Sequence, residues 1–455
     1  MARKKENLTS AERLEEALVP EGEQPYPVPG NWCWMRGRAF LKPMETKRPE
    51  GEVFRYIDID SIDNKRQQVT EPKNLQVKDA PSRASRKLRT GDTVFSMVRP
   101  YLMNIAYIDE TISNSIASTG FYVCTPTENV NSLYLYYLMT SPYTVDGLNR
   151  YMKGDNSPSI RKDDIENYVY PIPPLPEQQR IVNRIESLFA KLDEAKQKAQ
   201  DALDSFEPRK AAILHRAFTG ELTAQWRKEH GVGMESWEAR TSTQLFEYVT
   251  SGSRGWAKYY ADNGDIFVRM GNLNHGTIEL DLSDIQYVNL PGQTEGQRTK
   301  LQKNDILISI TADIGMVGIV REMEQNAYIN QHIALARPTA KDNAEFLAWY
   351  LISDVGLQQM RNKQRGATKI GLGLDDIRSL ELLIPTREEQ DEVVYILDNL
   401  LANEQQAKEA AEGVLEQIDL IKKAILARAF RGELGTNDPS EESAQELIKN
   451  FIFKM

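Results

Sequence analysis

The sequence has few cysteines and no long apolar run, and each absence excludes a class of protein. Its two cysteines, Cys33 and Cys124, cannot build a disulfide framework, so a reducing compartment is expected. No stretch approaches the roughly 18 apolar residues that are needed to cross a membrane. Residues 1–7 carry charge and lead into no apolar run, so no signal peptide is predicted. We therefore expect a cytoplasmic protein.

Sequence motifs for catalysis are also lacking. No lysine directly follows a glycine, which excludes a P-loop of the Gly-Lys-Ser/Thr type. The Asn- or Asp-Pro-Pro-aromatic motif expected of an adenine methyltransferase does not occur, and the glycine-rich segment 366–373 lacks the strand-then-helix setting of a nucleotide site. The four histidines form no zinc set, and His332 is expected to be structural or DNA-facing. We predict no catalytic site, no metal and no cofactor in this chain.

Acidic residues outnumber basic ones, 66 to 56, which disfavours nucleic-acid binding because phosphate contacts need Lys and Arg. The net charge is −10. The distribution is uneven, however: residues 36–100 contain 15 Lys and Arg against 9 Asp and Glu, whereas residues 436–446 contain four acidic residues and no basic one. The overall charge therefore weakens a DNA-binding hypothesis without excluding it.

The most informative feature is an internal repeat. Residues 213–222 read Ile-Leu-His-Arg-Ala-Phe-Thr-Gly-Glu-Leu, and residues 425–434 read Ile-Leu-Ala-Arg-Ala-Phe-Arg-Gly-Glu-Leu, so eight of ten positions are identical at an offset of 212. The chain is predicted to be a tandem duplication of a unit of about 212 residues. Further matches are 163–165 with 375–377, 87–96 with 300–309, and 174–182 with 385–393, the last at an offset of 211.

Each repeat begins with a segment of mixed pattern. Residues 25–173 and 233–385 combine short β-rich runs with Gly, Pro and Asn punctuation, and one helix per repeat is expected at 132–140 and 344–352. The two mixed segments share only a skeleton, whereas the ends of the helices that follow them are almost the same. The matching helix ends should have the same role in both repeats, and the differing mixed segments should have different roles. The pattern predicts a symmetric helical spacer that carries two dissimilar domains.

A long helix is expected after each mixed segment, because apolar residues recur at spacings of four and three. Pro176 and Glu177 suit its first turn, Pro208 is expected to interrupt it, and Gly220 and Gly432 suit carboxyl-terminal caps. Two such stripes are expected to pair as an antiparallel coiled coil, although each could instead pack on its own domain. The stripes are Ile181, Ile185, Leu188, Leu192, Ala195, Ala199, Ala202 and Phe206, and then Val393, Leu397, Leu400, Glu404, Ala407, Ala411, Val414, Ile418, Ile421 and Ile425.

The order of mixed segment and heptad helix, repeated twice, resembles the specificity subunit of type I restriction–modification enzymes. The resemblance covers roughly residues 25–435. The phrases that carry it are Pro173-Pro-Leu-Pro-Glu-Gln-Gln-Arg-Ile-Val, Leu301-Gln-Lys-Asn-Asp-Ile-Leu and Asn330-Gln-His-Ile-Ala-Leu-Ala-Arg-Pro, with Pro29-Gly-Asn-Trp echoed by Met234-Glu-Ser-Trp.

The resemblance implies an α+β fold, in which two mixed α/β target-recognition domains are separated by long helices that pair as an antiparallel coiled coil, in a pseudo-two-fold tandem repeat. It implies that each domain reads one half of a split double-stranded DNA sequence. Two methyltransferase subunits, which would hold S-adenosylmethionine, are expected to dock on the helices, and restriction–translocase subunits to join them. The expected boundaries are a charged extension 1–24 with a short helix at 10–18, target-recognition domain 1 at 25–173, a central helical spacer at 174–232, target-recognition domain 2 at 233–385, a second helical spacer at 386–435, and an acidic tail with a short helix at 436–455.

Basic clusters in the mixed segments are the candidate DNA contacts, since Lys and Arg neutralise phosphates and arginine also pairs with guanine. The densest cluster, 83–89, is flanked by Arg99 and Tyr101, and clusters at 153–162 and 361–369 occupy matching places in the two repeats. Each cluster could instead be a solvated loop. The candidates are Arg83, Arg86, Lys87, Arg89, Arg99, Lys153, Arg161, Lys162, Arg254, Lys258, Arg269, Arg361, Lys363, Arg365 and Lys369.

The repeated Arg-Ala-Phe-x-Gly-Glu-Leu segment is a candidate for binding two identical partners, although it could equally cap and anchor each helix. A non-catalytic coiled-coil scaffold that binds proteins and not DNA is the alternative function, which the acidic net charge favours slightly. The candidate partner-binding residues are Arg216, Phe218, Glu221, Arg428, Phe430 and Glu433.

Overall fold

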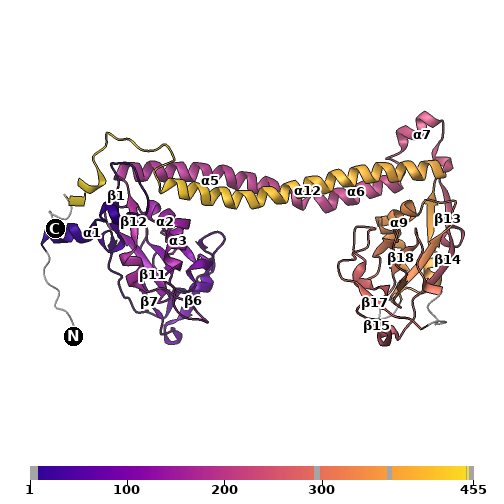
Figure 1. Ribbon diagram of the computed structural model, residues 1–455, viewed down its shortest axis with the longest axis horizontal. Coiled ribbons are helices and arrows are strands. Elements are labelled where there is room, and N and C mark those ends of the chain that lie inside the picture. Colours follow the sequence, from indigo (N-terminus) through magenta and orange to yellow (C-terminus); the bar gives the residue numbers. More distant parts are fainter. Residues whose placement is uncertain (1–8, 292–297, 366–370, 447, 450–455) are drawn as a thin grey trace. The chain divides into compact units, whose positions relative to one another are not determined.

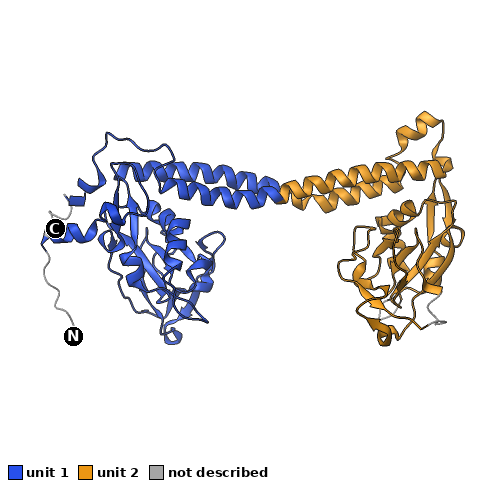
Figure 2. Cartoon of the chain, viewed as in Figure 1, with its two compact units in different colours: residues 1–199, 413–455 blue, residues 200–412 orange. Residues whose placement is uncertain are grey.

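The computed structural model forms two compact units, which Figure 2 shows in blue and orange. Unit 1 contains residues 1–199 and 413–455, and unit 2 contains residues 200–412. Each unit therefore combines the mixed segment of one repeat with helical residues of the other repeat. The residues that the structure describes are 9–291, 298–365, 371–446 and 448–449.

Unit 1 is built around two four-stranded sheets (Figure 1). The sheet β2-β11-β8-β9 is antiparallel and carries the main core, because every residue of β8 is buried and Tyr122 of β11 is 1% exposed. The sheet β6-β3-β10-β7 contains one parallel pair, β3 with β10. The strands are β1 (Cys33–Arg36), β2 (Leu41–Lys42), β3 (Val53–Ile57), β4 (Ile62–Asp63), β5 (Gln68–Val69), β6 (Lys73–Gln76), β7 (Ala84–Lys87), β8 (Thr93–Ser96), β9 (Ile105–Tyr107), β10 (Ile116–Ser118), β11 (Phe121–Pro126) and β12 (Val169–Ile172).

Unit 2 has the same plan. The sheet β14-β21-β18-β19 corresponds to β2-β11-β8-β9, and β13 pairs with β22 as β1 pairs with β12. The sheet β15-β17-β16-β20 contains the parallel pair β16 with β20, which matches β3 with β10. The strands are β13 (Glu238–Thr241), β14 (Phe246–Ser251), β15 (Tyr260–Ala261), β16 (Asp265–Val268), β17 (Gln286–Val288), β18 (Ile306–Ser309), β19 (Val317–Ile319), β20 (Ala327–Ile329), β21 (Ile333–Pro338) and β22 (Glu381–Ile384).

The helix predicted in each mixed segment is confirmed at the expected residues. These helices are α2 (Ser132–Thr140) and α9 (Ala344–Ile352), and α2 packs on the main sheet of unit 1. Asn131 and Asn343 begin them, because each side chain accepts hydrogen bonds from two backbone N–H groups of the first turn. The shorter helices are α1 (Ser10–Ala17), α3 (Pro142–Asn149), α4 (Lys162–Asn167), α7 (Ala224–His230), α8 (Ser242–Leu245), α10 (Asp354–Asn362) and α11 (Leu374–Arg378).

Three long helices follow the mixed segments: α5 (Leu175–Asp204), α6 (Phe206–Phe218) and α12 (Arg387–Ala429). In unit 1, α5 and α12 run antiparallel, since Asp193 lies 2.5 Å from Lys422 and Lys196 lies 3.8 Å from Asp419. The expected interruption falls at Ser205, just before Pro208. Proline lacks the N–H that would bond the carbonyl of Asp204, so α5 ends there.

In unit 2, α6 and the first part of α12 also run antiparallel. Arg209 of α6 forms a 2.8 Å ion pair with Glu404, and Thr223, which follows α6, donates a 2.6 Å hydrogen bond to Glu389. Residues later in the segment 209–223 therefore contact residues earlier in α12, as an antiparallel arrangement requires. Across the described ranges, no helix combines the length and the apolar character that a membrane span requires.

Matching hydrogen bonds show that the repeat offset remains 212 where the long helices begin. Gln178 of α5 accepts from the backbone N–H of Asn131 at 2.7 Å and donates to the carbonyl of the proline five residues before it. Gln390 of α12 forms the same two bonds, the first from Asn343 at 2.8 Å. The offset of 211 predicted for 174–182 is therefore wrong by one residue. Both segments contain Glu and Gln next to each other, so their sequences can be aligned at an offset of 211 or 212. The matching hydrogen bonds of Gln178 and Gln390 show that 212 is correct.

The predicted first stripe is confirmed, because each of its residues is buried or half-buried. Beyond Glu404 the second stripe is confirmed at Ala411, Ile418 and Ile425, which are buried or half-buried. It is wrong at Ala407, Val414 and Ile421, which are exposed, Val414 at 40% and Ile421 at 43%. The buried and half-buried residues of this part still recur at spacings of four and three, at 404, 408, 411, 415, 418, 422 and 425, so the heptad repeat continues and only one of its two positions is displaced by one residue. The residue after each of the three is half-buried instead: Lys408, Leu415 and Lys422.

Each helix end is anchored in the unit of the other repeat's mixed segment. Phe218, at the end of α6, is 3% exposed in the core of unit 2, where its ring lies 5.3 Å from that of Phe346 in α9. Phe430, directly after α12, is fully buried in the core of unit 1, 5.4 Å from Tyr134 of α2. The predicted caps follow, since Gly220 and Gly432 have φ of 78° and 75°, a conformation that glycine adopts without strain.

A buried carboxylate is held in each unit by a different segment: by the tail after α12 in unit 1, and by the segment after α6 in unit 2. In unit 1, fully buried Glu177 accepts 2.8 Å hydrogen bonds from Trp32 and from Asn437 of the tail. In unit 2, fully buried Glu389 at the matching position accepts from Thr223 and from Arg227 of α7. The two equivalent carboxylates are thus hydrogen-bonded by segments that do not correspond in the two repeats.

Candidate nucleic-acid interface

Three loops of unit 1 meet where β11 begins. The backbone N–H of Met97 donates to the Gly120 carbonyl at 2.9 Å, and the Met97 carbonyl accepts from Ile160 at 2.9 Å. The backbone N–H of Arg99 donates to the Pro158 carbonyl at 2.8 Å. These bonds hold the three loops together. We call them loop frame 1, which comprises residues 97–99, 118–120 and 153–160.

Unit 2 builds the same arrangement where β21 begins. The backbone N–H of Ile310 donates to the His332 carbonyl at 3.0 Å, and the Ile310 carbonyl accepts from Leu372 at 2.9 Å. Arg365 and Gly371 exchange backbone hydrogen bonds of 3.1 and 3.0 Å, as Lys153 and Ser159 exchange two of 3.0 Å in loop frame 1. We call residues 310–312, 330–332, 365 and 371–372 loop frame 2; residues 366–370 lie outside the described part of the chain.

The two frames share a strained backbone position. Arg99 has φ of 47°, and Ala312 at the equivalent position has φ of 62°. A residue with a Cβ pays about 1–3 kcal/mol for this left-handed conformation, which is found mainly at functional sites. Both units keep it, although one carries arginine and the other alanine, so the backbone shape and not the side chain is common to them.

Loop frame 1 gathers cations that have no acidic partner. Arg99 and Lys153 are exposed, and Arg161 directly follows the frame. Arg83 adjoins it as well, because its carbonyl accepts a 2.9 Å hydrogen bond from the backbone N–H of Thr119. Within the described ranges, no carboxylate oxygen lies within 4.0 Å of these four cations. Such cations are available to neutralise phosphates.

Two exposed tyrosines accompany these cations. Tyr101 follows Arg99 by two residues, Tyr151 precedes Lys153 by two, and each is 47% exposed. Exposed aromatic rings beside unpaired cations suit stacking and hydrogen bonding to nucleotides. The guanidinium of Arg99 donates one 2.7 Å hydrogen bond to the Asn156 carbonyl and leaves its other edge free.

Loop frame 2 carries a different set of side chains. His332 is half-buried; its Nδ1 lies 2.6 Å from the Thr311 hydroxyl and its Nε2 lies 3.0 Å from the Gln331 amide nitrogen. Exposed Arg254 adjoins this frame, because the preceding Ser253 forms a β-bridge with Asn330. The frame therefore presents amide, imidazole and hydroxyl groups where loop frame 1 presents a guanidinium.

Several predicted DNA contacts are already paired with carboxylates. Glu45 binds both Lys87 and Arg89, and these two cations lower the pKa of its carboxyl group to about 2. The remaining paired candidates are Lys162 with Glu166 (3.6 Å), Arg269 with Asp284 (2.9 Å) and Arg365 with Asp376 (2.7 Å). Surface pairs of this kind are weak, so they reduce the local positive charge without blocking a phosphate contact.

The other predicted contacts lack a carboxylate partner among the described residues, but they do not all lie at the frames. Arg86 is half-buried on β7, Lys258 lies 4.8 Å from the Tyr259 ring centroid, and Arg361 is exposed on α10. Lys363 lines a shallow hollow with Gln359 and Glu381. Lys369 lies outside the described residues.

The sequence candidates omitted the polar cluster of loop frame 2. Thr311 and Gln331 belong to it, and the sequence predicts His332 only as a structural or DNA-facing residue. The signal was present in the match of 87–96 with 300–309, because extending it by three residues aligns Arg99 with Ala312. Only the closure of the loops by backbone hydrogen bonds shows that these positions meet.

The candidate partner-binding segments divide into buried and exposed parts. Phe218 and Phe430 are buried in their units, so they anchor the helix ends and present no surface for a partner. The other four residues remain accessible: Arg216 and Glu221 form a 3.4 Å surface pair, and the side chain of exposed Arg428 donates a 3.0 Å hydrogen bond to the Glu433 carbonyl.

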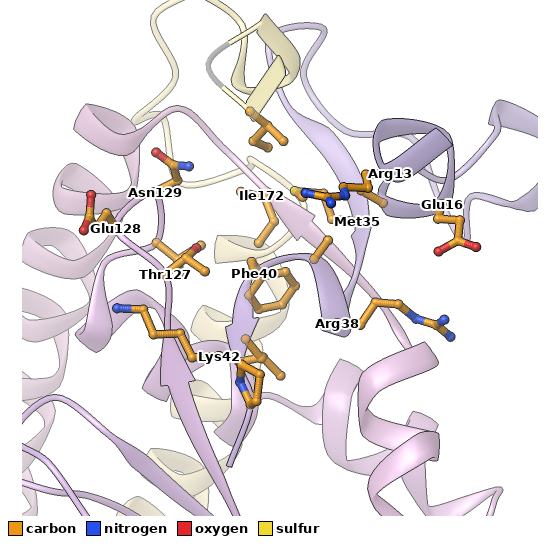
Figure 3. Close-up of a pocket in the computed structure, with 16 residues that line it drawn as sticks. Arg13, Glu16, Met35, Arg38, Phe40, Lys42, Thr127, Glu128, Asn129 and Ile172 are labelled. Atoms are coloured by element: carbon orange, nitrogen blue, oxygen red, sulfur yellow. The ribbon is translucent and has the colours of Figure 1, made fainter. Parts of the chain in front are cut away.

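Unit 1 has a cavity of about 550 Å³, shown in Figure 3, and no residue of loop frame 1 lines it. Met35 and Phe40 line its apolar part, and Lys42 lies on β2, which pairs with the opposite end of β11 from Gly120. Unit 2 carries the Arg240–Asp342 ion pair (2.6 Å) in the equivalent segments. Among the described residues, no group of three or more His, Cys, Asp or Glu side chains could hold a metal ion.

The comparisons with known proteins point to one family. The sequence model of the type I restriction modification DNA specificity domain matches residues 36–203 and 234–413. The chain is similar to the type I restriction enzyme EcoKI specificity subunit of Escherichia coli K12, with 24% identity over 91% of this chain and 90% of that one. It is also similar to the EcoBI specificity subunit of Escherichia coli, with 26% identity over 59% of each chain.

Solved structures give the same result. The HsdS subunit from Thermoanaerobacter tengcongensis matches with a TM-score of 0.67 and 25% identity, over 90% of this chain and 99% of that one. A chain from a structure of complex assembly in the type I R-M system matches with a TM-score of 0.72 and 25% identity, over 90% and 100%.

Proposed function

The chain belongs to the family of type I restriction–modification DNA specificity domains, and on this premise we propose that it selects the DNA site of a type I complex by reading two separate half-sites, one with each unit. The observation that carries this proposal is the pair of loop frames, which share one backbone arrangement and differ in side chains. Equal backbones are suited to the same groove geometry, and different side chains are suited to different bases.

Phosphate contacts are expected to come from the unpaired cations. Lys153 lies in loop frame 1, Arg83 and Arg161 flank that frame, and Arg254 flanks loop frame 2. Phosphate binding depends on local charge, so a chain with a net charge of −10 can bind DNA through such patches. The scaffold alternative is not favoured, because the relatives are DNA specificity subunits.

The partners follow from the same premise. Two methyltransferase subunits are proposed to dock on the helices, with S-adenosylmethionine held by them, and restriction–translocase subunits to complete the assembly in the cytoplasm. The near-identical Arg-Ala-Phe-x-Gly-Glu-Leu segments support two equivalent docking places. Exposed apolar residues of α12 also support docking there, since Leu420 is 64% exposed and Ile421 is 43% exposed.

The test is co-expression with the methyltransferase and genome-wide mapping of methylated adenines. The expected result is a bipartite motif with a fixed gap, in which exchange of residues 25–173 for those of a relative changes one half only. Methylation that does not depend on this chain would refute the proposed function. Binding of the complex to duplex DNA should also weaken steeply with salt, whereas a scaffold would show no such dependence.

A further inference from the structure

We infer that the two loop frames are the base-reading sites, in which Arg99 reads a guanine of one half-site and the Gln331 amide, held by His332, reads an adenine of the other. This inference rests on the proposed function and names the residues that determine specificity. Arginine pairs bidentately with guanine in the major groove, and glutamine pairs bidentately with adenine.

The first argument is that equivalent backbone positions of the two loop frames carry side chains of different chemistry. Loop frame 1 has Arg99 and Gly120 where loop frame 2 has Ala312 and His332. Packing does not require the glycine, because a Cβ at Gly120 would lie 3.6 Å from its nearest neighbours, an ordinary contact. The frame therefore tolerates different side chains at both positions, as expected if they serve recognition.

The second argument is the state of the Arg99 side chain. It is exposed and its backbone is left-handed, so this position stores strain. Among the described residues, its side chain has one hydrogen-bond partner, the Asn156 carbonyl at 2.7 Å, which orients the guanidinium without neutralising it. A positioned guanidinium with a free edge loses little conformational entropy when it binds a planar base edge.

The third argument is the restraint on Gln331. The hydrogen bonds of His332 to the Thr311 hydroxyl and the Gln331 amide link three neighbouring side chains of loop frame 2. One N–H of the Gln331 amide can satisfy the imidazole, which leaves its second N–H and its oxygen for a base. An adenine edge presents one acceptor and one donor to such an amide.

The experiment compares substitutions in the complete complex with its methyltransferase. Arg99→Ala is expected to relax one guanine position in one half of the methylated motif, and His332→Ala or Gln331→Ala to relax one adenine position in the other half. Each lost contact should reduce discrimination at that position by roughly 5- to 100-fold. Arg99→Gln should shift the preference from guanine toward adenine.

Matched controls lie at the opposite ends of the same strands. Lys42, next to the end of β11, and exposed Lys341, beyond the end of β21, carry positive charge away from the frames. Lys42→Ala and Lys341→Ala should leave the motif unchanged. A wild-type motif in all frame variants would refute the inference while the bipartite motif itself still supported the proposed function. No bipartite motif in the wild type would refute the proposed function instead.

Loss of all methylation in a frame variant is resolved by binding. The purified variant complex is titrated with a duplex of the wild-type motif and with a duplex in which the assigned base pair is replaced. Equal affinities support the assignment, and a retained wild-type preference overturns it. The complex with Lys42→Ala provides the reference preference.

Discussion

Each long helix ends in the unit that contains the other repeat's mixed segment, and this arrangement predicts which unit each terminal phenylalanine stabilises. Sequence order alone would predict the opposite assignment. Phe430→Ala removes a fully buried ring that contacts Tyr134 in unit 1, and Phe218→Ala removes the corresponding ring from unit 2. If each helix packed on its own repeat, Phe218 would stabilise the first mixed segment. The structure predicts the opposite: Phe218→Ala destabilises unit 2, and Phe430→Ala destabilises unit 1.

The magnitude follows from burial. Truncation of a buried phenylalanine to alanine costs about 3–5 kcal/mol, because it removes apolar contact and leaves a cavity. Loss of the edge-on ring contact contributes about 0.5–1.5 kcal/mol within that range. The affected core should therefore open roughly 100-fold to several thousand-fold more often.

Hydrogen–deuterium exchange of the full chain distinguishes the two units. Phe430→Ala should accelerate exchange in α2 and spare α9, and Phe218→Ala should accelerate exchange in α9 and spare α2. Leu420→Ala, on α12 at 64% exposure, is the control and should change stability by no more than about 0.5 kcal/mol. Faster exchange in α9 after Phe430→Ala would refute the exchanged anchoring.

Four further predictions concern charge and docking. Arg227→Ala leaves fully buried Glu389 without its 2.5 Å partner and should lower the free energy of unfolding by about 3–5 kcal/mol in denaturant titrations, whereas replacing both residues by methionine should recover most of the loss. Glu45→Ala frees Lys87 and Arg89, so the slope of log affinity for DNA against log salt should become more negative by up to about 1.8; an unchanged slope would place these cations away from DNA. The same pairs set a pH dependence: because the Glu45 pKa is lowered to about 2, its stabilising pairing is complete above the usual glutamate range and is lost only as pH falls toward 2, which side-chain NMR titration can follow. Leu420→Asp should reduce co-purification with the methyltransferase at an unchanged melting temperature, and full recovery of the complex would contradict docking on that face of α12.

Local signals were sufficient for much of the fold. Turn residues and apolar patterning predicted the helices at 132–140 and 344–352, because asparagine caps and short-range hydrogen bonds act within a few residues. The repeat in the sequence predicted two copies of one fold, since homologous segments bury the same apolar positions. The first heptad stripe was correct for the same reason.

The errors arose where several alignments or periods fit the sequence equally well. Lys408 and Lys422 occupy half-buried positions of α12 that the predicted stripe assigns to the preceding residues, Ala407 and Ile421. Long charged side chains can cover apolar surface with their stems, so the sequence pattern does not reveal which residue faces inward. The offset error at 174–182 had the same origin, because the hydrogen bonds of Gln178 are visible only in the packed structure.

Residue order is enough to show that the chain carries two similar frameworks with different surface chemistry, since repetition and divergence are both properties of residue order. Which residues contact one another depends on how the chain folds in three dimensions. Residues 97–99, 118–120 and 153–160 are distant in sequence, and backbone hydrogen bonds bring them together. Backbone groups are the same at every residue, so such closure leaves no signature in side-chain identity. The sequence likewise does not show that each long helix ends in the unit of the other repeat's mixed segment. The positions of Phe218 and Phe430 in the two cores show it.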